Sequence, residues 1–481
     1  MEKKYVNWID ANSELLIDAS DQIWDFAELA LEEYKSSELL VKILDENGFS
    51  VEKGVADMPT AFTASYGSGK KPVIGILGEY DALPGLNQAA KPFRESLKEN
   101  APGHGCGHNL LGVGSLGAVL AVKNAIDAGD AKGTIRYYGC PAEEQFNAKG
   151  YMVNKGLLND VDISLTWHPF FLNMVNLMSA LALNSVVFQF HGRTAHAAGD
   201  PQNGRSALDA VELMNIGVNY LREHVIPDAR LHYVITNGGK VPNIVPDFAE
   251  VWYYVRAPKR PFVEEIYKRV VKIAKGAALM TETELKIDFL TGCYNHMIND
   301  TVCKVIHNNM LDARPPKFNK KDKDFAKELQ KSIPENSMDG YYRFVPPDFM
   351  DLAKAVLEQP LNKIILPEIG KGAIWSGSTD VADVSWVIPL GEFQMACQVI
   401  GSPGHSWQNV STSGMSIGHK GMLAAAKTLT LSALQFMNSP QLVEKAQKEF
   451  NIKIKNNGSY KSPLPDGLKP PFHRTKLLSK S

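Results

Sequence analysis

The chain has 481 residues, of which 44% are hydrophobic and 22% are charged, and its formal net charge is −2. This length exceeds what one hydrophobic core usually supports, so it predicts two domains of soluble globular composition. The near-neutral charge gives no reason to expect nucleic acid or an anionic membrane as a partner. No uninterrupted apolar run is expected to span a bilayer.

The N-terminal residues and the cysteines favour a cytosolic location. Acidic and polar residues follow Met1 within a dozen positions, which is unlike a secretory signal. The five cysteines form an odd and scattered set, as expected in a reducing compartment rather than in a disulfide framework. We therefore expect a cytoplasmic protein.

The first part of the chain alternates helical and strand-like patterns. Apolar residues recur near helical spacing over residues 13–47. Residues 110–128 are apolar and rich in small side chains, which predicts a helix that Asn109 could cap. The predicted strands are short apolar runs, as in a parallel sheet buried on both faces, at residues 73–77, 134–138 and 161–166.

The pattern changes near Leu183. Strand, helix, strand, strand, helix and strand follow one another at residues 185–192, 207–224, 231–236, 248–256, 263–277 and 283–289. Four strands and two helices in this order predict a small α+β sandwich with an antiparallel sheet. We interpret it as a domain inserted into the first one.

Beyond about Asn295 the α/β pattern resumes. Residues 314–341 are rich in Lys and interrupted by Pro, which predicts a solvated excursion, whereas residues 392–400 are expected to form a late strand. Residues 418–437 are predicted to be the final long helix, and the tail after Ser439 is expected to be partly draped and partly loose. The assignment is thus an α/β domain with a mixed, largely parallel sheet and helices on both faces at 1–183 and 295–440, the inserted domain with its four-stranded antiparallel sheet at 184–294, and a tail at 441–481.

A glycine-rich turn, Gly103-His104-Gly105-Cys106-Gly107-His108-Asn109, places a thiol and an imidazole two residues apart. Alternate residues of an extended turn can point the same way, so Cys106 and His108 could bind one metal ion. Further ligand-type residues each follow a strand-like run, namely Asp81, Glu143, Glu144, His168 and His405. Because the carboxyl ends of the strands form the ligand-binding edge of an open α/β sheet, these side chains are predicted to share one pocket.

The residue types in this set suit two divalent transition ions. Thiolate and imidazole favour Zn, and carboxylate also tolerates Mn or Co. The five candidate ligands are Cys106, His108, Glu144, His168 and His405, too many for one closed tetrahedral site but suited to two ions with a shared ligand and a shared water. Glu143 is then free to take a proton from a metal-bound water and deliver it to a departing amine. The predicted chemistry is amide hydrolysis by metal-bound hydroxide.

Each of these residues has a simpler interpretation when it is taken singly. An isolated His or Cys near a strand end is more often a packed core group, adjacent glutamates are usually a solvated loop, and Asp81 could cap a turn. The remaining histidines have no such context and are expected to have ordinary structural roles: His104, His191, His224, His232, His296, His307, His419 and His473. A thiol enzyme built on Cys106 and His108 is disfavoured because neighbouring residues on one turn form a poor nucleophile–base pair.

Six motifs occur in an order that resembles a known family. They are Glu79-Tyr80-Asp81-Ala82-Leu83-Pro84, His104-Gly105-Cys106-Gly107-His108-Asn109, Pro141-Ala142-Glu143-Glu144, Trp167-His168-Pro169, Gly192-Arg193-Thr194-Ala195-His196-Ala197-Ala198 and Gly404-His405-Ser406. The set resembles the metallo-aminoacylase/carboxypeptidase family of amidohydrolases, in the branch that contains plant auxin-conjugate hydrolases, over roughly residues 10–440. The stretch from Trp375 to Trp386 is similar to one component of a heteromeric hydrolase in this branch.

The resemblance implies a catalytic domain with two metal ions and an inserted lid that also dimerises. It assigns the same five ligands, with Glu143 as the general acid/base and Asp81 as the carboxylate that orients a histidine ligand. It further implies that His196 reaches the active site of a partner subunit and steadies the oxyanion, and that Asn243 contacts the substrate. Arg256, together with Arg193 and Arg205, is a possible partner for a substrate carboxylate.

The implied activity is hydrolysis of the amide between an acyl or aroyl group and an amino acid, with p-aminobenzoyl-glutamate as the candidate substrate. Two Zn or Mn ions per chain are expected, with Co as an option. Cys106 stands where many relatives have a bridging Asp, so its thiolate could bridge the ions. The lid implies a homodimer or a heteromer, and the alternative is a non-catalytic, metal-holding subunit that depends on a partner chain.

Overall fold

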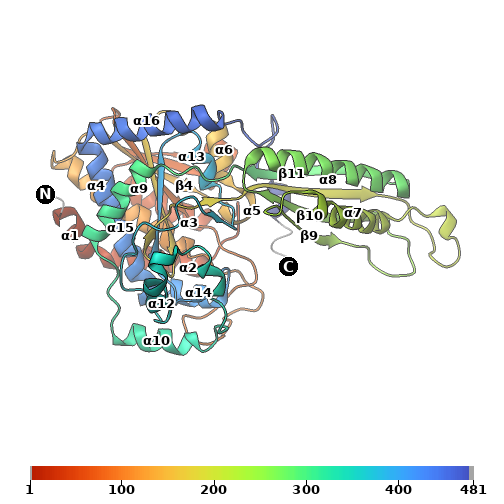
Figure 1. Cartoon of the computed structure of the whole chain (residues 1–481), viewed down its shortest axis with the longest axis horizontal. Coiled ribbons are helices and arrows are strands. Elements are labelled where there is room, and N and C mark those ends of the chain that lie inside the picture. The colour runs from red at the N-terminus through yellow and green to blue at the C-terminus, as the bar shows by residue number, and fades with distance from the viewer. Residues whose placement is uncertain (1–2, 476–481) are drawn as a thin grey trace.

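The computed structural model describes residues 3–475, which form a broad α/β body and a narrow arm (Figure 1). A seven-stranded sheet runs through the body in the order β1-β2-β4-β3-β5-β13-β6. The neighbours β4, β3, β5 and β13 are parallel, and the other pairs are antiparallel, which confirms the predicted mixed sheet. The strands are β1 Ser50–Lys53, β2 Phe62–Gly67, β3 Val73–Glu79, β4 Thr134–Cys140, β5 Ile163–Phe170, β6 Met174–Val175 and β13 Leu390–Ala396.

Helices cover both faces of this sheet. Along β3, Ile74 and Ile76 pack into one buried layer and Val73 and Leu77 into the opposite one, as the alternation of side chains in a strand requires. The first layer contains α1 Lys3–Ala11, α2 Ser13–Phe26, α3 Tyr34–Glu46, α4 His108–Asp127, α9 Asp300–Ala313 and α15 Ser416–Asn438. The second layer contains α6 Ala148–Asn154 and α13 Val381–Ser385.

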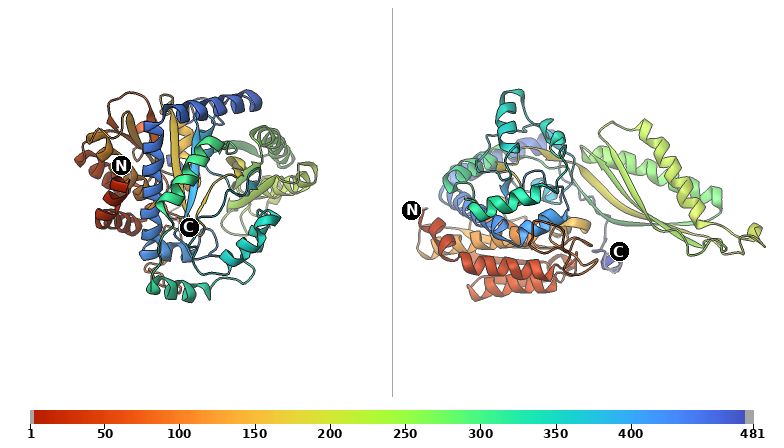
Figure 2. Two further views of the ribbon diagram at one scale, coloured as in Figure 1. Left: turned by 60° about the vertical axis from the view of Figure 1, so that its left-hand side comes forward. Right: turned by 90° about the horizontal axis from the view of Figure 1, so that it is seen from below.

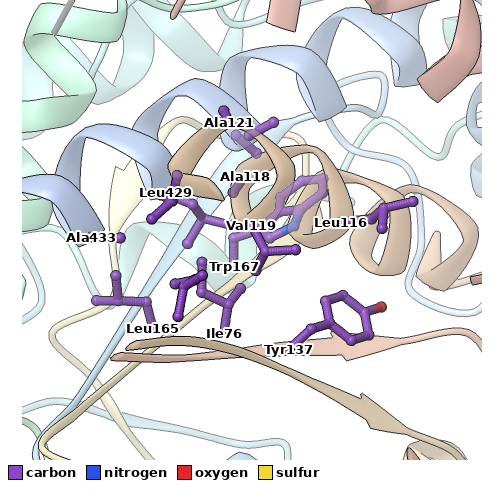
Figure 3. Close-up of a cluster of buried hydrophobic side chains, with 14 of the residues drawn as sticks. Ile76, Leu116, Ala118, Val119, Ala121, Tyr137, Leu165, Trp167, Leu429 and Ala433 are labelled. Carbon is purple, nitrogen blue, oxygen red and sulfur yellow. The ribbon is translucent and has the colours of Figure 1, made fainter. Parts of the chain in front are cut away.

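Helix α4 is the central helix of the first layer and packs over Ile76 and Trp167 (Figure 3). A Cβ atom added to Gly114 would lie 2.7 Å from the Trp167 ring, so this close approach requires glycine. By length and composition α4 could cross a membrane, so the expectation that no apolar run is long enough is wrong. Because 83% of its apolar window is buried inside the body, α4 is weak evidence for a membrane span.

The arm is a four-stranded antiparallel sheet in the order β11-β8-β10-β9, which confirms the predicted inserted α+β domain. Its strands are β8 Ala182–His191, β9 Arg230–Asn237, β10 Phe248–Ala257 and β11 Glu284–Cys293. Its helices, α7 Ala207–Leu221 and α8 Arg260–Thr281, pack against each other and share one apolar core with the sheet. Figure 2 shows the arm projecting from the body.

The predicted helix over residues 13–47 is wrong in its middle. The structure has two helices there, α2 and α3, and the segment between them includes Ala27 at φ 42° and Leu31 at φ 64°. Left-handed backbone of this kind cannot continue an α-helix, although the apolar spacing on either side is helical. The left-handed backbone therefore interrupts the helix, and the spacing of apolar residues does not predict this conformation.

Asn109 does not cap helix α4. The residue before the helix is Gly107, at φ 81°, and Asn109 lies inside the first turn, where it is fully buried. Its side-chain amide donates to Ser20 Oγ at 3.0 Å and to the Ser413 carbonyl oxygen at 3.1 Å. Asn109 therefore joins α4 to two distant segments of the body.

Residues 314–341 are not only a solvated excursion. They contain helix α10, Lys320–Gln330, which begins with a reciprocal capping box between Asn319 and Asp322. Leu329 of this helix is fully buried, and Lys420 pairs with Asp322. The helix thus packs on the body, and the Lys-rich composition describes only its outer face.

The segment after α15 is more ordered than predicted. Helix α16, Pro440–Asn457, follows directly, and residues 458–475 then run to the arm. Arg474 pairs with Glu250 at 2.8 Å and with Asp288 at 2.6 Å, and its side chain is 7% exposed. Tyr460 donates to Asp383 of the body at 2.9 Å. The segment therefore links body and arm, while the rest of the predicted tail, residues 476–481, lies outside the described residues.

Candidate metal centre and active site

The ligand-type residues meet at the carboxyl edge of the parallel strands. Asp81 follows β3, and the turn that enters α4 presents Cys106 and His108. Glu143 and Glu144 open the short helix α5, Glu143–Phe146, after β4, and His168 lies near the end of β5. His405 comes from the loop between β13 and helix α14, Trp407–Ser413. Segments far apart in the sequence thus supply one site.

The five candidate ligands form two groups of three that share Cys106. One group is Cys106, His108 and His168, the other is Cys106, Glu144 and His405, and within each group the ligand atoms lie within 4.8 Å of one another. Cys106 Sγ is 3.4 Å from His168 Nε2, and Glu144 Oε2 is 3.3 Å from His405 Nε2. Two three-atom sets joined by one thiol are the arrangement that two ions with a bridging ligand need.

The histidines are oriented by hydrogen bonds to their other ring nitrogen. His108 Nδ1 donates to Asp81 Oδ1 at 2.8 Å, and Asp81 Oδ2 accepts the backbone N–H of Glu144 at 2.9 Å. His168 Nδ1 donates to the Pro169 carbonyl oxygen at 2.7 Å. Both Nε2 atoms are thereby directed to the site, as is usual for histidine metal ligands. Asp81 does this for one imidazole and positions the α5 backbone as well.

Several buried ligand atoms at the site make no hydrogen bond within residues 3–475, although His108 Nε2 and Glu79 Oε2 lie 3.2 Å from each other. Unsatisfied atoms of this kind fit divalent cations. His108 Nε2, Glu144 Oε1 and Glu79 Oε2 are buried without a hydrogen bond, which is costly unless another group satisfies them. Burial raises the pKa of the Cys106 thiol, and the Glu144 carboxylate raises it further. A bound cation would reverse this effect and favour the thiolate, so the donor set fits two metal ions.

Glu143 lies beside the donor atoms without belonging to the two groups that share Cys106. Its carboxylate clusters with Glu79 and His108 within 4.8 Å. Burial raises the pKa of Glu143 well above its usual value, and the negative charges of Glu79 and nearby acids add to the increase. Ala142 at φ 54° and Asn147 at φ 51° flank helix α5, so strained backbone brackets this carboxylate. A carboxyl group poised in this way is suited to proton transfer.

A buried ion network behind the ligands was not predicted. Lys149 Nζ lies 2.5 Å from Glu79 Oε1 and 2.7 Å from Asp380 Oδ1, and the three side chains are 2% exposed or less. The second oxygen of Glu79 lies 3.2 Å from His108 Nε2. Glu79 and Asp380 stand in the motifs that carry the family resemblance, which was an available signal, whereas nothing in the sequence singles out Lys149.

The catalytic pocket has a volume of about 320 Å³ and includes residues that the sequence did not mark. His296, for which an ordinary structural role was predicted, lines it, is 3% exposed and has no hydrogen-bond partner for either ring nitrogen among the described residues. The carboxylate of Glu392 lies 3.6 Å from His296 Nδ1. Arg256 of β10, which the sequence did mark as a candidate carboxylate partner, also lines the pocket, with its guanidinium 5.2 Å from the Tyr254 ring and its Nε buried without a hydrogen bond in residues 3–475.

His196 and Asn243 lie outside this pocket in the single chain. Both are exposed on the arm, where Ala197 N donates to the Asn243 carbonyl oxygen at 3.1 Å. Arg205 pairs with Glu282 at 2.8 Å and, like Arg193, does not line the pocket. The roles that the resemblance gives to His196 and Asn243 stay predictions that require a second copy of the arm.

Comparisons with known proteins agree with this geometry. Residues 182–281 match the model of the peptidase dimerisation domain of the M20 type. The chain is 40% identical to one of the component chains of p-aminobenzoyl-glutamate hydrolase from Escherichia coli (strain K12), over 96% of this chain and 97% of that protein. The fold is similar to a putative aminohydrolase from methicillin-resistant Staphylococcus aureus (TM-score 0.62, 15% identity, 91% and 100% of the two chains). It is also similar to a dinuclear metal-binding peptidase of the M20 family from Bacillus subtilis (TM-score 0.55, 16% identity, 89% and 99%).

Proposed function

The chain belongs to the M20 family of metal-dependent amide hydrolases, and on that premise we propose that it hydrolyses N-aroyl amino acids, with p-aminobenzoyl-glutamate as the substrate. The observation that carries this proposal is the pair of three-residue donor groups joined by Cys106, four of whose five residues line the pocket: Cys106, Glu144, His168 and His405. The relative that is 40% identical supplies the candidate substrate by its name.

Two divalent ions would be held by the five candidate ligands, and Zn or Mn suits a set of one thiolate, three imidazoles and one carboxylate. When bound, such ions supply a water of lowered pKa and polarise the scissile carbonyl group. Asp81 and the Pro169 carbonyl oxygen fix the histidine rings for this purpose. Cys106 belongs to both donor groups, so its thiolate would be shared by the two ions.

Glu143 moves the proton in the proposed reaction. Its carboxylate accepts a proton from the attacking water and returns it to the nitrogen of the departing amino acid, which needs a group whose pKa lies above that of an ordinary carboxylate. Burial together with Glu79 provides this increase in the pKa of Glu143. Arg256, whose Nε has no partner among the described residues, is placed to bind a carboxylate of the amino acid.

The test compares two adjacent glutamates. In Glu143→Gln we expect kcat to fall by about 10²- to 10⁴-fold with an unchanged metal content, because only the proton acceptor is removed. In Glu144→Gln we expect metal content and activity to fall together, because a ligand is lost. Amino-acid release from p-aminobenzoyl-glutamate and metal analysis of both variants decide the matter. Normal turnover by Glu143→Gln would exclude the proposed role.

We further propose that the active protein is a dimer in which His196 of one copy completes the site of the other. Glu143→Gln and His196→Ala are each expected to be nearly inactive. After the two variants are mixed and reassembled, half of the dimers are mixed and carry one intact site of two, so about a quarter of wild-type activity should return. Absence of recovery in a proven mixed dimer would contradict the shared site. Activity that appears only after a different, related chain is added would instead support the partner-dependent alternative.

A further inference from the structure

An apolar chamber adjoins the catalytic pocket, and the M20 comparisons do not assign it. The segment 338–375 builds most of it with helices α11, Asp339–Tyr342, and α12, Met350–Leu357. Phe344, Leu352 and Ala353 come from this segment, and Phe170 and Leu172 come from the end of β5 and the residues after it. No charged side chain lines the chamber within residues 3–475, and Gln394 is the only amide side chain there.

The chamber is continuous with the catalytic pocket through a shared wall. Phe170, Met178, Tyr341, Trp375 and Gln394 line both spaces. The Phe170 ring meets Trp375 edge-on at 6.3 Å, and the Tyr341 ring is 5.7 Å from Trp375. The three rings of the shared wall thus contact one another at distances typical of favourable aromatic pairs, and they offer aromatic surface to a ring that enters from the catalytic side.

Strand geometry places this wall directly beside the metal centre. Phe170 is two residues after His168 in β5, so both side chains project from the same face of the sheet. Gln394 of the neighbouring strand β13 is the register partner of His168. Its Oε1 is buried without a hydrogen-bond partner among the described residues. The polar site thus changes to apolar surface within one pair of adjacent strands.

The charged side chains around the catalytic pocket and the chamber determine which end of the substrate enters each of them. Arg256 lines only the catalytic pocket, and its guanidinium suits a carboxylate of an amino acid. His296 also lines only this pocket and can offer a ring N–H, although burial lowers its pKa to about 4. A carboxylate in the chamber would find no cation among residues 3–475, and an aromatic ring in the catalytic pocket would leave the chamber wall exposed to water. The chamber volume is about 60 Å³, below the roughly 150 Å³ of a cavity that holds benzene. A ring would therefore lie across the shared wall, with its inner edge in the chamber.

We propose that the apolar chamber receives the aromatic ring of the acyl group and makes the protein selective for N-aroyl over N-acetyl amino acids. This inference rests on the proposed hydrolase function and names the residues that select the acyl group. Phe170, Tyr341 and Trp375 hold the ring, and the segment 338–375 determines how deeply the ring enters.

The test places the same substitution at two positions of α12. Ala353→Phe fills the chamber from a residue that lines it, whereas Ala355→Phe adds the same ring to an exposed residue outside the lining. We expect Ala353→Phe to lower kcat/KM for p-aminobenzoyl-glutamate and benzoyl-glutamate by at least about 10-fold, as loss of a buried ring contact implies. For N-acetyl-glutamate we expect no more than about a 2-fold change, and Ala355→Phe should change none of the three.

Phe344→Ala provides a second route, because it removes apolar lining instead of adding volume, and it should lower aroyl selectivity in the same direction. Equal losses for the acetyl and aroyl substrates, or no loss in either variant, would overturn the proposal. Calorimetric binding of p-aminobenzoate against acetate tests the chamber without turnover, and we expect the ring preference of the wild type to disappear in Ala353→Phe. If no N-acyl amino acid is hydrolysed but this preference is present, the hydrolase proposal fails and the ring site stands. If N-acyl amino acids are hydrolysed without any aroyl preference, the hydrolase proposal stands and the ring site fails.

Discussion

The buried Lys149 ammonium group gives the sharpest test of how the metal centre is supported. Lys149→Met keeps much of the side-chain volume but leaves Glu79 and Asp380, both 2% exposed or less, without their cation. Breaking a buried ion pair from one side costs about 3–5 kcal/mol, because the remaining charge is buried and unpaired. We expect this loss in the free energy of unfolding, measured in urea by circular dichroism with a chelator present so that metal binding does not contribute.

Lys155→Met is the matched control, since Lys155 pairs with Asp57 at 2.8 Å but both side chains are more than half exposed. An exposed pair of this kind contributes little because solvent screens it, so this variant should unfold close to wild type. Adding Asp380→Asn to Lys149→Met should return part of the lost stability, because one of the two stranded carboxylates is neutralised. If Lys149→Met costs no more than Lys155→Met, the argument from burial is refuted.

Three further predictions concern packing, pH and the C-terminal segment. Gly114→Ala should destabilise the protein by about 1–3 kcal/mol, because its Cβ would lie 2.7 Å from the Trp167 ring. A Cβ at Gly276 would meet nothing within 4 Å, so Gly276→Ala should be neutral or stabilise by up to about 1 kcal/mol. Urea unfolding of both variants tests the opposite signs. Burial raises the pKa of Asp383 to about 7, so the folded state holds this proton more tightly than the unfolded state. The stability that Asp383 contributes therefore falls as pH rises from about 4 to 7. Asp383→Asn lacks this loss, so its free energy of unfolding should rise relative to wild type across that window, and parallel pH profiles of the two proteins would contradict this. Arg474→Ala removes the guanidinium that pairs with both Glu250 and Asp288 of the arm. Deuterium exchange should therefore speed up in β10 and β11 but not in β3, and unchanged exchange in the arm would show that the segment does not stabilise it.

Much of the architecture was predictable because it depends on local pattern. Apolar runs without alternation predicted strands buried on both faces, and β3, β4 and β5 confirm them. The strand and helix order of the arm was likewise readable from its local sequence pattern. The predictions from sequence were wrong where the structure depends on a left-handed backbone conformation or on contacts with residues far away in the chain. Leu31 adopts left-handed backbone between α2 and α3, and Arg474 is ordered by acids of a distant domain.

The amino-acid sequence by itself predicted which side chains gather at the candidate metal centre, because thiol, imidazole and carboxylate groups recur after successive strands and parallel strands end at one edge. Only the tertiary structure decided that Cys106 is shared by both donor groups and that Lys149 neutralises the acids behind them. It also decided that the segment 338–375 closes an apolar chamber against β5. The physical reason is that the ability to bind a metal ion depends on the type of side chain, which the sequence states. Whether a ligand is shared, a carboxylate neutralised or a chamber closed depends on distances between residues that are remote in the chain.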